Sequence, residues 1–289
     1  MPAECTIYLF YENVMKPISI INPRLQQAQC KPSAPRYFSK VITMICAFFL
    51  LQNINAQNTG NKEKEDSSWI KFQQYIEYMI HNDWAHLSKY KDANAALGLP
   101  KADEKRVVFM GNSITEGWMD TDPEFFKENK YINRGIGGQT TPQMLVRFRA
   151  DVINLQPKVV VILAGTNDIA GNTGPSTPEM IQNNIASMAE LAQAHHIKVV
   201  LCSVTPAYDY PWKPGLQPAD KIVALNEWIK QYAIKNNCIY ADYWTMMADE
   251  RKGMKKELSK DGVHPTIEGY KIMEPIVQQA IKKALQNKK

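Results

Sequence analysis

The sequence predicts a three-layer α/β/α sandwich around a parallel sheet of about five strands. Five short runs are almost entirely apolar and rich in β-branched residues, as expected of strands that are covered on both faces. Stretches with apolar residues at helical spacing separate the runs, which is typical of parallel strands joined by crossover helices. The predicted strands cover residues 107–110, 131–133, 159–163, 198–203 and 239–241.

Helical periodicity follows each predicted strand except the first. Pro275 lies inside the last helical stretch, where proline removes a backbone hydrogen bond, so we expect a kink there. The predicted helices cover residues 142–154, 178–195, 219–235 and 267–285.

Further helical spacing precedes the first strand. Residues 69–100 carry apolar and aromatic side chains at helical intervals, which predicts one or two helices packed on the main domain. Residues 57–68 are polar and charged and are interpreted as a linker. The main domain is then expected to cover residues 101–289.

The N-terminus has the features of an export signal. Residues 41–51 are almost entirely apolar and follow Arg36 and Lys40, and Ala56 is a small residue that suits cleavage after it. This run of eleven residues is too short for a membrane-spanning helix, which needs about 20. We therefore interpret residues 1–56 as a signal-peptide region with an over-extended start, and expect an exported protein without a transmembrane anchor.

Two other interpretations of this apolar run remain open. It could form a helix buried in a core. It could also belong to a lipoprotein signal that ends at Cys46, although the three residues before Cys46 lack the small side chain usual there.

The net charge and the spacing of histidine and cysteine residues indicate neither a nucleic-acid partner nor a metal site. The formal net charge is +5, and residues 1–56 contain five basic and two acidic residues, so cleavage after Ala56 leaves +2. This value does not indicate a nucleic-acid partner. Histidines and cysteines do not have metal-ligand spacing, so no metal is expected. Cys202 and Cys238 follow Ala56 and could be paired or free in an exported protein.

Polar clusters follow the predicted strands where the strands end. The carboxyl ends of parallel strands meet at one edge of the sheet, where ligands bind. Ser113 follows the first strand in a Gly-Asn-Ser turn that can present its hydroxyl at the start of a helix. This position makes Ser113 a candidate nucleophile, and a plain helix N-cap is the alternative.

A histidine and an aspartate lie close together before the last predicted helix. His264 follows Asp261 by three residues in Asp-Gly-Val-His-Pro, so a local turn can bring the carboxylate to one ring nitrogen. The other nitrogen would then face the cleft as a general base. A surface loop with an incidental histidine is the alternative.

Two further clusters offer hydrogen-bond donors. Acyl transfer places negative charge on a carbonyl oxygen, and preorganised N–H groups must stabilise that charge. Glycine at 138 allows the backbone to approach a substrate, Asn167 offers its side-chain amide, and Ser113 offers its own N–H. A tight turn at residues 137–138 and a helix cap at residues 167–168 are the alternatives.

Taken in order, these four blocks resemble those of the SGNH (GDSL-type) hydrolases. Residues 133–168 are especially similar to the acetylhydrolase branch represented by the platelet-activating-factor acetylhydrolase catalytic subunits. The resemblance covers about residues 106–285 and implies the flavodoxin-like fold of SGNH hydrolases for the main domain. The blocks are Gly111-Asn-Ser-Ile114, Asn133-Arg-Gly-Ile-Gly-Gly-Gln-Thr140, Gly165-Thr-Asn-Asp168 and Asp261-Gly-Val-His-Pro265.

The resemblance implies a role for each block. Ser113 would be the nucleophile, His264 the base and Asp261 the acid that orients it. Ser113, Gly138 and Asn167 would form the oxyanion hole. The implied enzyme is a serine esterase that needs no cofactor, and because the branch includes dimers, a homodimer is an open expectation.

One residue departs from the family pattern. Asn112 stands where the family name has aspartate. No chemistry is assigned to this position, so the departure leaves the predicted activity in place and weakens only a lipase interpretation.

The loop after the fourth predicted strand contains aromatic residues that could bind a sugar. Residues 205–218 are rich in proline and contain Tyr208, Tyr210 and Trp212. Flat aromatic faces at the edge of a site suit a sugar ring. The alternative is that these side chains pack the loop onto the body.

Residues nearer the predicted nucleophile favour short acyl groups. Trp118 and Ile136 are expected to line the acyl side, and the sequence contains no evident long apolar groove. The predicted substrates are therefore short-chain esters, above all O-acetyl groups on carbohydrate. A lysophospholipase or thioesterase of the same family, or a non-catalytic exported glycan-binding module with an unreactive Ser113, are the alternatives.

Overall fold

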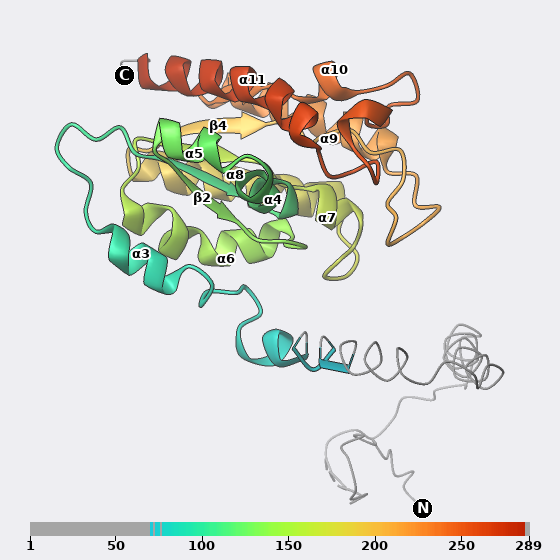
Figure 1. Cartoon of the computed structure of the whole chain (residues 1–289), viewed down its shortest axis with the longest axis horizontal. Coiled ribbons are helices and arrows are strands. Elements are labelled where there is room, and N and C mark those ends of the chain that lie inside the picture. Colours follow the sequence, from blue (N-terminus) through green and yellow to red (C-terminus); the bar gives the residue numbers. More distant parts are fainter. Residues whose placement is uncertain (1–69, 72, 76, 287–289) are drawn as a thin grey trace, which may run out of the picture. The chain divides into compact units, whose positions relative to one another are not determined.

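The computed structural model describes residues 70–286 apart from 72 and 76. The predicted signal-peptide region and linker, residues 1–56 and 57–68, lie outside the described residues. One five-stranded parallel sheet has the order β2-β1-β3-β4-β5, which confirms the predicted fold class. Figure 1 shows the sheet with helices packed around it. Its strands are β1 (Val107–Gly111), β2 (Tyr131–Gly135), β3 (Val159–Ile162), β4 (Lys198–Cys202) and β5 (Ile239–Ala241).

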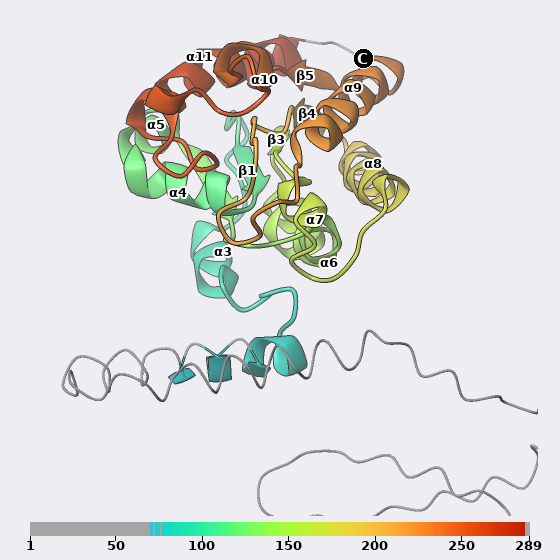
Figure 2. The same ribbon diagram turned by 90° about the vertical axis from the view of Figure 1, so that its right-hand side faces the viewer.

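Helices cover both faces of the sheet (Figure 2). On one face, α4 (Ser113–Thr121) and α5 (Pro123–Asn129) pack on β2, and α11 (Ile267–Gln286) packs on β3, β4 and β5. The other face carries α6 (Thr141–Asp151), α8 (Pro178–Ala194) and α9 (Ala219–Lys235). The four predicted helices correspond to α6, α8, α9 and α11, whereas α4 and α5 are additional.

Shorter elements complete the described chain. Residues 70–82 are largely helical and precede α3 (Lys91–Leu97), which contacts α6. Pro275 lies inside α11, and the helix continues on both sides of it. None of the described helices combines the length and the hydropathy of a membrane span. The remaining short helices are η2 (Ile153–Leu155), α7 (Thr166–Ile169), α10 (Trp244–Met247) and η3 (Lys256–Leu258).

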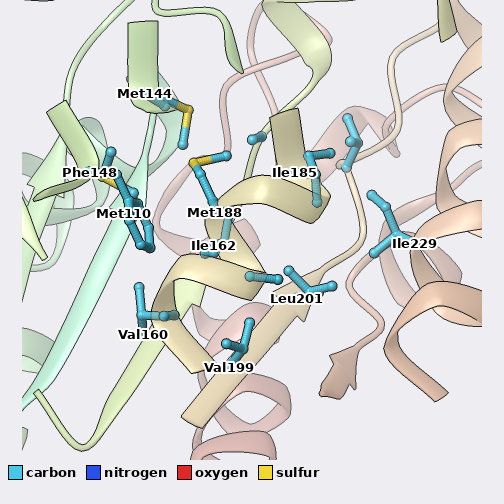
Figure 3. Packing of buried hydrophobic residues seen from close by; sticks show 14 of the residues in the cluster. Met110, Met144, Phe148, Val160, Ile162, Ile185, Met188, Val199, Leu201 and Ile229 are labelled. Carbon is cyan, nitrogen blue, oxygen red and sulfur yellow. The ribbon is translucent and has the colours of Figure 1, made fainter. Parts of the chain in front are cut away.

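The core has one part on each side of the sheet. Figure 3 shows the part between the sheet and α6, α8 and α9, where side chains of the strands meet side chains of these helices. Because both faces of β1, β3 and β4 are buried, nearly every position in these three strands is apolar, and this explains their continuous apolar runs in the sequence. The strand side chains include Met110, Val160, Ile162, Val199 and Leu201, and the helix side chains include Met144, Phe148, Ile185, Met188 and Ile229.

The two cysteines after residue 56 are free. Cys202 lies opposite Ala241 in the β4–β5 register, whereas Cys238 precedes the start of β5. The two thiols therefore lie at different levels along the strand pair. Both are buried, and burial raises the pKa of Cys202 to about 12 and that of Cys238 to about 11.

The parallel register places five loops at one edge of the sheet. Ser113 follows β1, Gly138 follows β2 and Asn167 follows β3. The aromatic loop follows β4, and the chain after β5 leads to His264 and α11. The predicted site residues thus come from segments that are distant in sequence and share one edge.

Candidate active site

Ser113 is the first residue of α4. The preceding residue, Asn112, caps this helix, because its side-chain oxygen accepts a hydrogen bond from the N–H of Ile114 at 3.2 Å. Asn112 therefore performs the capping role that was the alternative for Ser113, and the Ser113 hydroxyl is left for another partner. The turn is tight: a Cβ on Gly111 would lie 1.9 Å from Thr115 Oγ1, so only glycine fits there.

Three side chains form a continuous hydrogen-bonded line. Ser113 Oγ lies 2.9 Å from His264 Nε2, although the two residues are separated by 151 positions in the sequence. His264 Nδ1 lies 2.6 Å from Asp261 Oδ2. The side chains of His264 and Asp261 are each 40% exposed, so both the imidazole and the carboxylate are open to solvent. The roles assigned to these residues stay predictions, and their spatial order matches those roles.

The loop that carries His264 is organised around the carboxylate of Asp261. Asp261 Oδ1 accepts hydrogen bonds from the backbone N–H groups of Val263 at 2.9 Å and His264 at 2.8 Å. Partial burial opposes ionisation, but hydrogen bonds from the His264 ring and from these backbone groups outweigh it and lower the pKa of Asp261 to about 2. The carboxylate is therefore ionised at neutral pH and fixes both the ring and the loop.

Sequence reasoning missed Ser259, which ties this loop together. Its hydroxyl lies 3.0 Å from Asp261 Oδ1 and 2.8 Å from the carbonyl oxygen of His264, and it accepts a hydrogen bond from the N–H of Gly262 at 2.9 Å. Ser259 lies outside the Asp-Gly-Val-His-Pro block, and a single serine before such a block carries no signal in the sequence.

Gly138 lies in a turn that also leaves its N–H free. The turn is closed by a hydrogen bond from the N–H of Gln139 to the carbonyl of Ile136 at 3.4 Å, and Gly138 has a φ of 73°. Gly138 therefore lies in a tight turn, and this turn is compatible with its N–H acting as a donor. Within the described part of the chain, the N–H groups of Gly138 and Ser113 have no acceptor. The N–H of Gly137 is instead bound by the Glu116 carboxylate at 2.6 Å.

The Asn167 side chain is held by both of its polar atoms. Its amide nitrogen donates to the carbonyl of Gln139 at 2.9 Å, which leaves the second N–H of the amide for another acceptor. Its oxygen accepts a hydrogen bond from Asn172 at 3.1 Å. Asn172 also lies 3.3 Å from the carbonyl of Gly138, so it links two of the predicted donors. Asn172 lies beyond the Gly-Thr-Asn-Asp block, and sequence reasoning did not find it.

Asp168 holds the start of a neighbouring helix. Its carboxylate accepts hydrogen bonds from the N–H of Thr141 at 2.9 and 3.0 Å and from the Thr141 hydroxyl at 2.6 Å. Thr141 is the first residue of α6, so the helix-cap interpretation applies to Asp168, across two loops. Burial raises the pKa of Asp168 to about 6 although these hydrogen bonds oppose the shift.

The three aromatic residues of the loop after β4 differ in their surroundings. Trp212 is 40% exposed, and its ring lies 6.2 Å from that of His264. Its indole N–H donates to Asn172 at 3.1 Å. Tyr208 is 51% exposed and lies under the guanidinium of Arg251 at 5.0 Å. Trp212 and Tyr208 are therefore available to a ligand.

Tyr210 does not fit the predicted binding role. It is fully buried, its hydroxyl lies 2.8 Å from Thr166 Oγ1, and its ring stacks under Trp212 at 5.0 Å. It packs the loop onto the body, which was the alternative for this residue. Burial also raises the pKa of its hydroxyl to about 12.

Trp118 and Ile136 are also buried, which corrects the expectation that they line the acyl side. Trp118 is 1% exposed and stacks on Phe125 at 4.8 Å and on Tyr270 at 5.1 Å. Ile136 is 3% exposed. Both side chains belong to the packing behind the site.

A pocket of about 270 Å³ adjoins the loop that carries Asp261 and Gly262. Tyr208, Pro214, Arg251, Asp261 and Gly262 are among its lining residues. Ser113 and His264 are not, so the pocket adjoins the hydrogen-bonded line at Asp261 only. In residues 70–286, with the two gaps, no three histidine, cysteine or acidic side chains gather as a metal site would require.

Comparisons with known proteins show the family and the fold of this chain. Residues 109–272 match the model of the GDSL-like lipase/acylhydrolase family. The structure resembles that of a GDSL-like lipase from Bacteroides thetaiotaomicron, with 53% identity and a TM-score of 0.69 over 70% of this chain and 100% of that chain.

Two curated relatives match over shorter stretches. An acetylxylan esterase of Xylanibacter ruminicola is 27% identical over 220 residues, which are 63% of this chain and 44% of the relative. The human platelet-activating factor acetylhydrolase IB subunit alpha2 is 28% identical over 116 residues, which are 38% of this chain and 48% of the relative. The chain thus spans less than half the length of each of these two relatives. On the family model, which covers more than half of its residues, this chain belongs to the GDSL-like lipase/acylhydrolase family of ester hydrolases.

Proposed function

We propose that this protein is an exported serine esterase that removes short acyl groups, acetyl above all, from carbohydrate. The observation that carries the proposal is the line from Ser113 Oγ through the His264 ring to the Asp261 carboxylate, with distances of 2.9 and 2.6 Å. A hydroxyl, an imidazole and an ionised carboxylate in this order are the parts needed to activate a serine nucleophile.

The first step is acylation of the serine. Ser113 Oγ attacks the ester carbonyl carbon while His264 Nε2 takes the hydroxyl proton, and the Asp261 carboxylate stabilises the imidazolium. The carbonyl oxygen becomes an oxyanion that accepts hydrogen bonds from the N–H groups of Ser113 and Gly138 and from the Asn167 amide. The ester C–O bond then breaks, and the alcohol leaves with the proton from His264.

The second step returns the enzyme to its starting state. A water molecule gives a proton to His264 Nε2 and attacks the acyl carbon. The same three donors hold the second oxyanion. The bond to Ser113 Oγ breaks, the proton returns to that oxygen, and the carboxylic acid is released.

Charge near the nucleophile supports a short acyl group. Glu116 lies one helical turn after Ser113, and its carboxylate binds both the N–H of Gly137 and the ammonium of Lys89. Burying a long apolar chain against this pair would remove water from charged groups at a cost in free energy. An acetyl group is small enough to avoid that cost.

Exposed aromatic rings support a carbohydrate as the alcohol. Trp212 borders the His264 ring, and Tyr208 lines the adjoining pocket with Arg251. Flat aromatic faces beside polar groups suit sugar rings. A relative is also described as an acetylxylan esterase, at 27% identity.

Export is the remaining part of the proposal. Residues 1–56 have the pattern of a signal peptide, with a basic flank, an apolar stretch and a small residue at Ala56. Expression of the full chain in a bacterial host, followed by N-terminal sequencing of the exported protein, is expected to give a mature chain that begins at Gln57.

Labelling with a fluorophosphonate tests the enzyme assignment. The probe forms a covalent bond with an activated serine, and peptide mapping is expected to find the adduct on Ser113 of the wild-type protein. Ser113→Ala should bind no probe and keep its fold. A folded wild-type protein without label on Ser113 would contradict the assignment and favour a glycan-binding module.

A substrate panel tests the rest of the proposal. We expect kcat/KM to be higher for acetylated xylo-oligosaccharides than for p-nitrophenyl acetate, and to fall from p-nitrophenyl acetate to the butyrate and octanoate. A preference for octanoate or for acyl thioesters would replace the proposed substrate class with a lysophospholipase or thioesterase activity.

A further inference from the structure

Gln139 connects the two loops that supply the Gly138 and Asn167 donors. It follows Gly138 directly, and its carbonyl oxygen accepts a hydrogen bond from the Asn167 amide at 2.9 Å. This bond fixes the rotation of the amide, and with it the direction of the second N–H. A displacement of the Gln139 backbone would therefore move both donors together.

The Gln139 side chain is fastened at both of its polar atoms. Its oxygen accepts a hydrogen bond from Arg147 Nε at 2.5 Å, and its nitrogen donates to the carbonyl of Ala85 at 2.8 Å. The residue is 3% exposed. A buried amide with both ends bonded has little freedom to rotate, so it holds its own backbone in place.

Arg147 extends this connection to the nucleophile loop. It is fully buried, and its other nitrogens donate to the carbonyl of Gly111 at 2.9 Å and to Asp151 at 2.9 Å. Gly111 lies two residues before Ser113. Arg147 therefore links the end of β1 to the loop after β2, and Gln139 links the loop after β2 to Asn167.

The segment at residues 84–90 also contacts these loops, although it precedes the region that matches the family model. Ala85 accepts the bond from Gln139, and the Tyr90 hydroxyl donates to the carbonyl of Gly135 at 2.5 Å. Lys89 pairs with Glu116, which binds the N–H of Gly137. These three contacts join the segment to Gln139, to Gly135 at the end of β2 and to Glu116.

We infer that Gln139 is a positioning residue that keeps the N–H of Gly138 and the amide of Asn167 aimed at one point, and that the segment at residues 84–90 acts through it. The inference rests on the proposed function, because only an acyl-transfer reaction needs these donors to converge. Donors of this kind act only when they are held close to the productive geometry, and a misplacement of about 1 Å can reduce the rate by about 100-fold.

Substitutions at Gln139 test the inference, and Gln193 offers a matched control. Gln139→Met has a similar volume and loses both polar contacts, whereas Gln139→Glu keeps an oxygen for Arg147 and loses the donor to Ala85. Gln193 lies in the last turn of α8, and its side-chain nitrogen donates to the carbonyl of Asn236 at 2.6 Å, before the start of β5. Gln193→Met therefore removes a contact of the same kind away from the Gly138 and Asn167 donors.

Two measurements separate positioning from folding. The first is the split between kcat and KM for p-nitrophenyl acetate. The second is the affinity for a trifluoromethyl ketone, to which Ser113 Oγ adds at the carbonyl carbon to give a hemiketal oxyanion. We expect Gln139→Met to lower kcat by about 10- to 100-fold with KM changed less than about twofold, and to weaken the ketone by the same factor.

The variants are expected to form a series. Gln139→Glu should recover part of the loss, because the contact with Arg147 returns, and Gln193→Met should remain within about twofold of wild type. Assays are run well below the Tm of each variant, with the fold checked by circular dichroism.

Four outcomes would overturn the inference. They are a folded Gln139→Met with wild-type kcat, a loss of ketone affinity that does not follow kcat, an equal loss in Gln193→Met, and failure of both Gln139 variants to fold, which would make the residue structural. If only Gln139→Met fails to fold, Gln139→Glu decides, and a wild-type kcat in it overturns the inference. A wild-type protein that neither hydrolyses esters nor binds the fluorophosphonate would contradict the proposed function instead, so the two failures are distinct.

Discussion

Asp168 and Asp261 lie in loops at the same edge of the sheet, and their pKa values move in opposite directions. The carboxylate of Asp168 is buried against Thr141, and its pKa rises to about 6. The carboxylate of Asp261 is 40% exposed, it is bonded to the ring and backbone of His264, and its pKa falls to about 2. Both accept backbone hydrogen bonds, so the number of such bonds does not explain the difference.

Burial and the histidine ring account for the contrast. Loss of water opposes the charged form of Asp168, and its hydroxyl and backbone donors are too few to compensate. Asp261 keeps part of its water and gains a partner that becomes a cation during the proposed reaction. The comparison indicates that the Asp168 carboxyl holds the start of α6, whereas the surroundings of the Asp261 carboxyl suit its proposed part in the reaction.

The largest expected effect is that of Asp261→Asn. The amide can still contact the ring, but it favours the wrong tautomer of His264 and cannot stabilise the imidazolium, so we expect kcat to fall by about 10⁴. Because the side chain is well exposed, the free energy of unfolding should change by less than about 1 kcal/mol. Steady-state kinetics and urea unfolding of the same preparation measure both, and a change of less than tenfold in kcat would break the comparison.

The next largest effect is the pH dependence of the free energy of unfolding, which Asp168→Asn should change. The ordinary pKa of aspartate is 3.8 and the folded value is about 6, so the folded state binds the proton more tightly than the unfolded state does. The contribution of Asp168 to stability is therefore fully present below pH 4 and is lost as the pH rises through 6, by about 3 kcal/mol in total.

The asparagine variant does not titrate at this position and serves as the reference. Urea unfolding of both proteins between pH 4 and pH 7 should show the wild type losing stability relative to the variant as the pH rises. Parallel curves would mean that the Asp168 carboxyl is not perturbed. The sign is opposite for Asp261, whose smaller contribution is present above pH 3.8 and is lost as the pH falls through 2.

The smallest effect sharpens the contrast between the exposed and buried aromatic residues of the loop after β4. Trp212→Leu removes a ring beside His264, and we expect KM for acetylated xylo-oligosaccharides to rise by about tenfold, or about 1.4 kcal/mol, with p-nitrophenyl acetate little affected.

Tyr210→Phe is the control for this prediction. It removes a buried hydroxyl bonded to Thr166 and should lower the free energy of unfolding by about 1 kcal/mol without changing KM. Equal KM values for the two variants would indicate that neither ring contacts the sugar.

Trp118 illustrates why proximity in sequence misled the prediction. It lies five residues after Ser113, but in a helix five residues correspond to about 140° around the axis, so the two side chains point in different directions. Trp118 faces α5 and α11, where Phe125 and Tyr270 stack on it. Without α4 and α5 as predicted helices, this direction could not be deduced.

Local sequence pattern and long-range contact also separate the predicted site residues from those that sequence reasoning missed. Ser113, His264, Asp261, Gly138 and Asn167 lie in blocks whose residue types suggest a reaction. The other residues that hold the site have ordinary residue types, and only their hydrogen bonds across loops reveal them; they are Gln139, Arg147, Asn172 and Ser259.

The sequence by itself determined the layers of the fold, because strand burial and helix periodicity are local patterns. It also determined the order of the four polar blocks along the chain. It also identified the edge of the sheet where the polar blocks converge. Tertiary structure alone decided which aromatic side chains reach solvent, how the carboxyl groups of Asp168 and Asp261 titrate, and which buried side chains join the loops. These properties depend on water and on partners that are distant in sequence, and no local pattern encodes them.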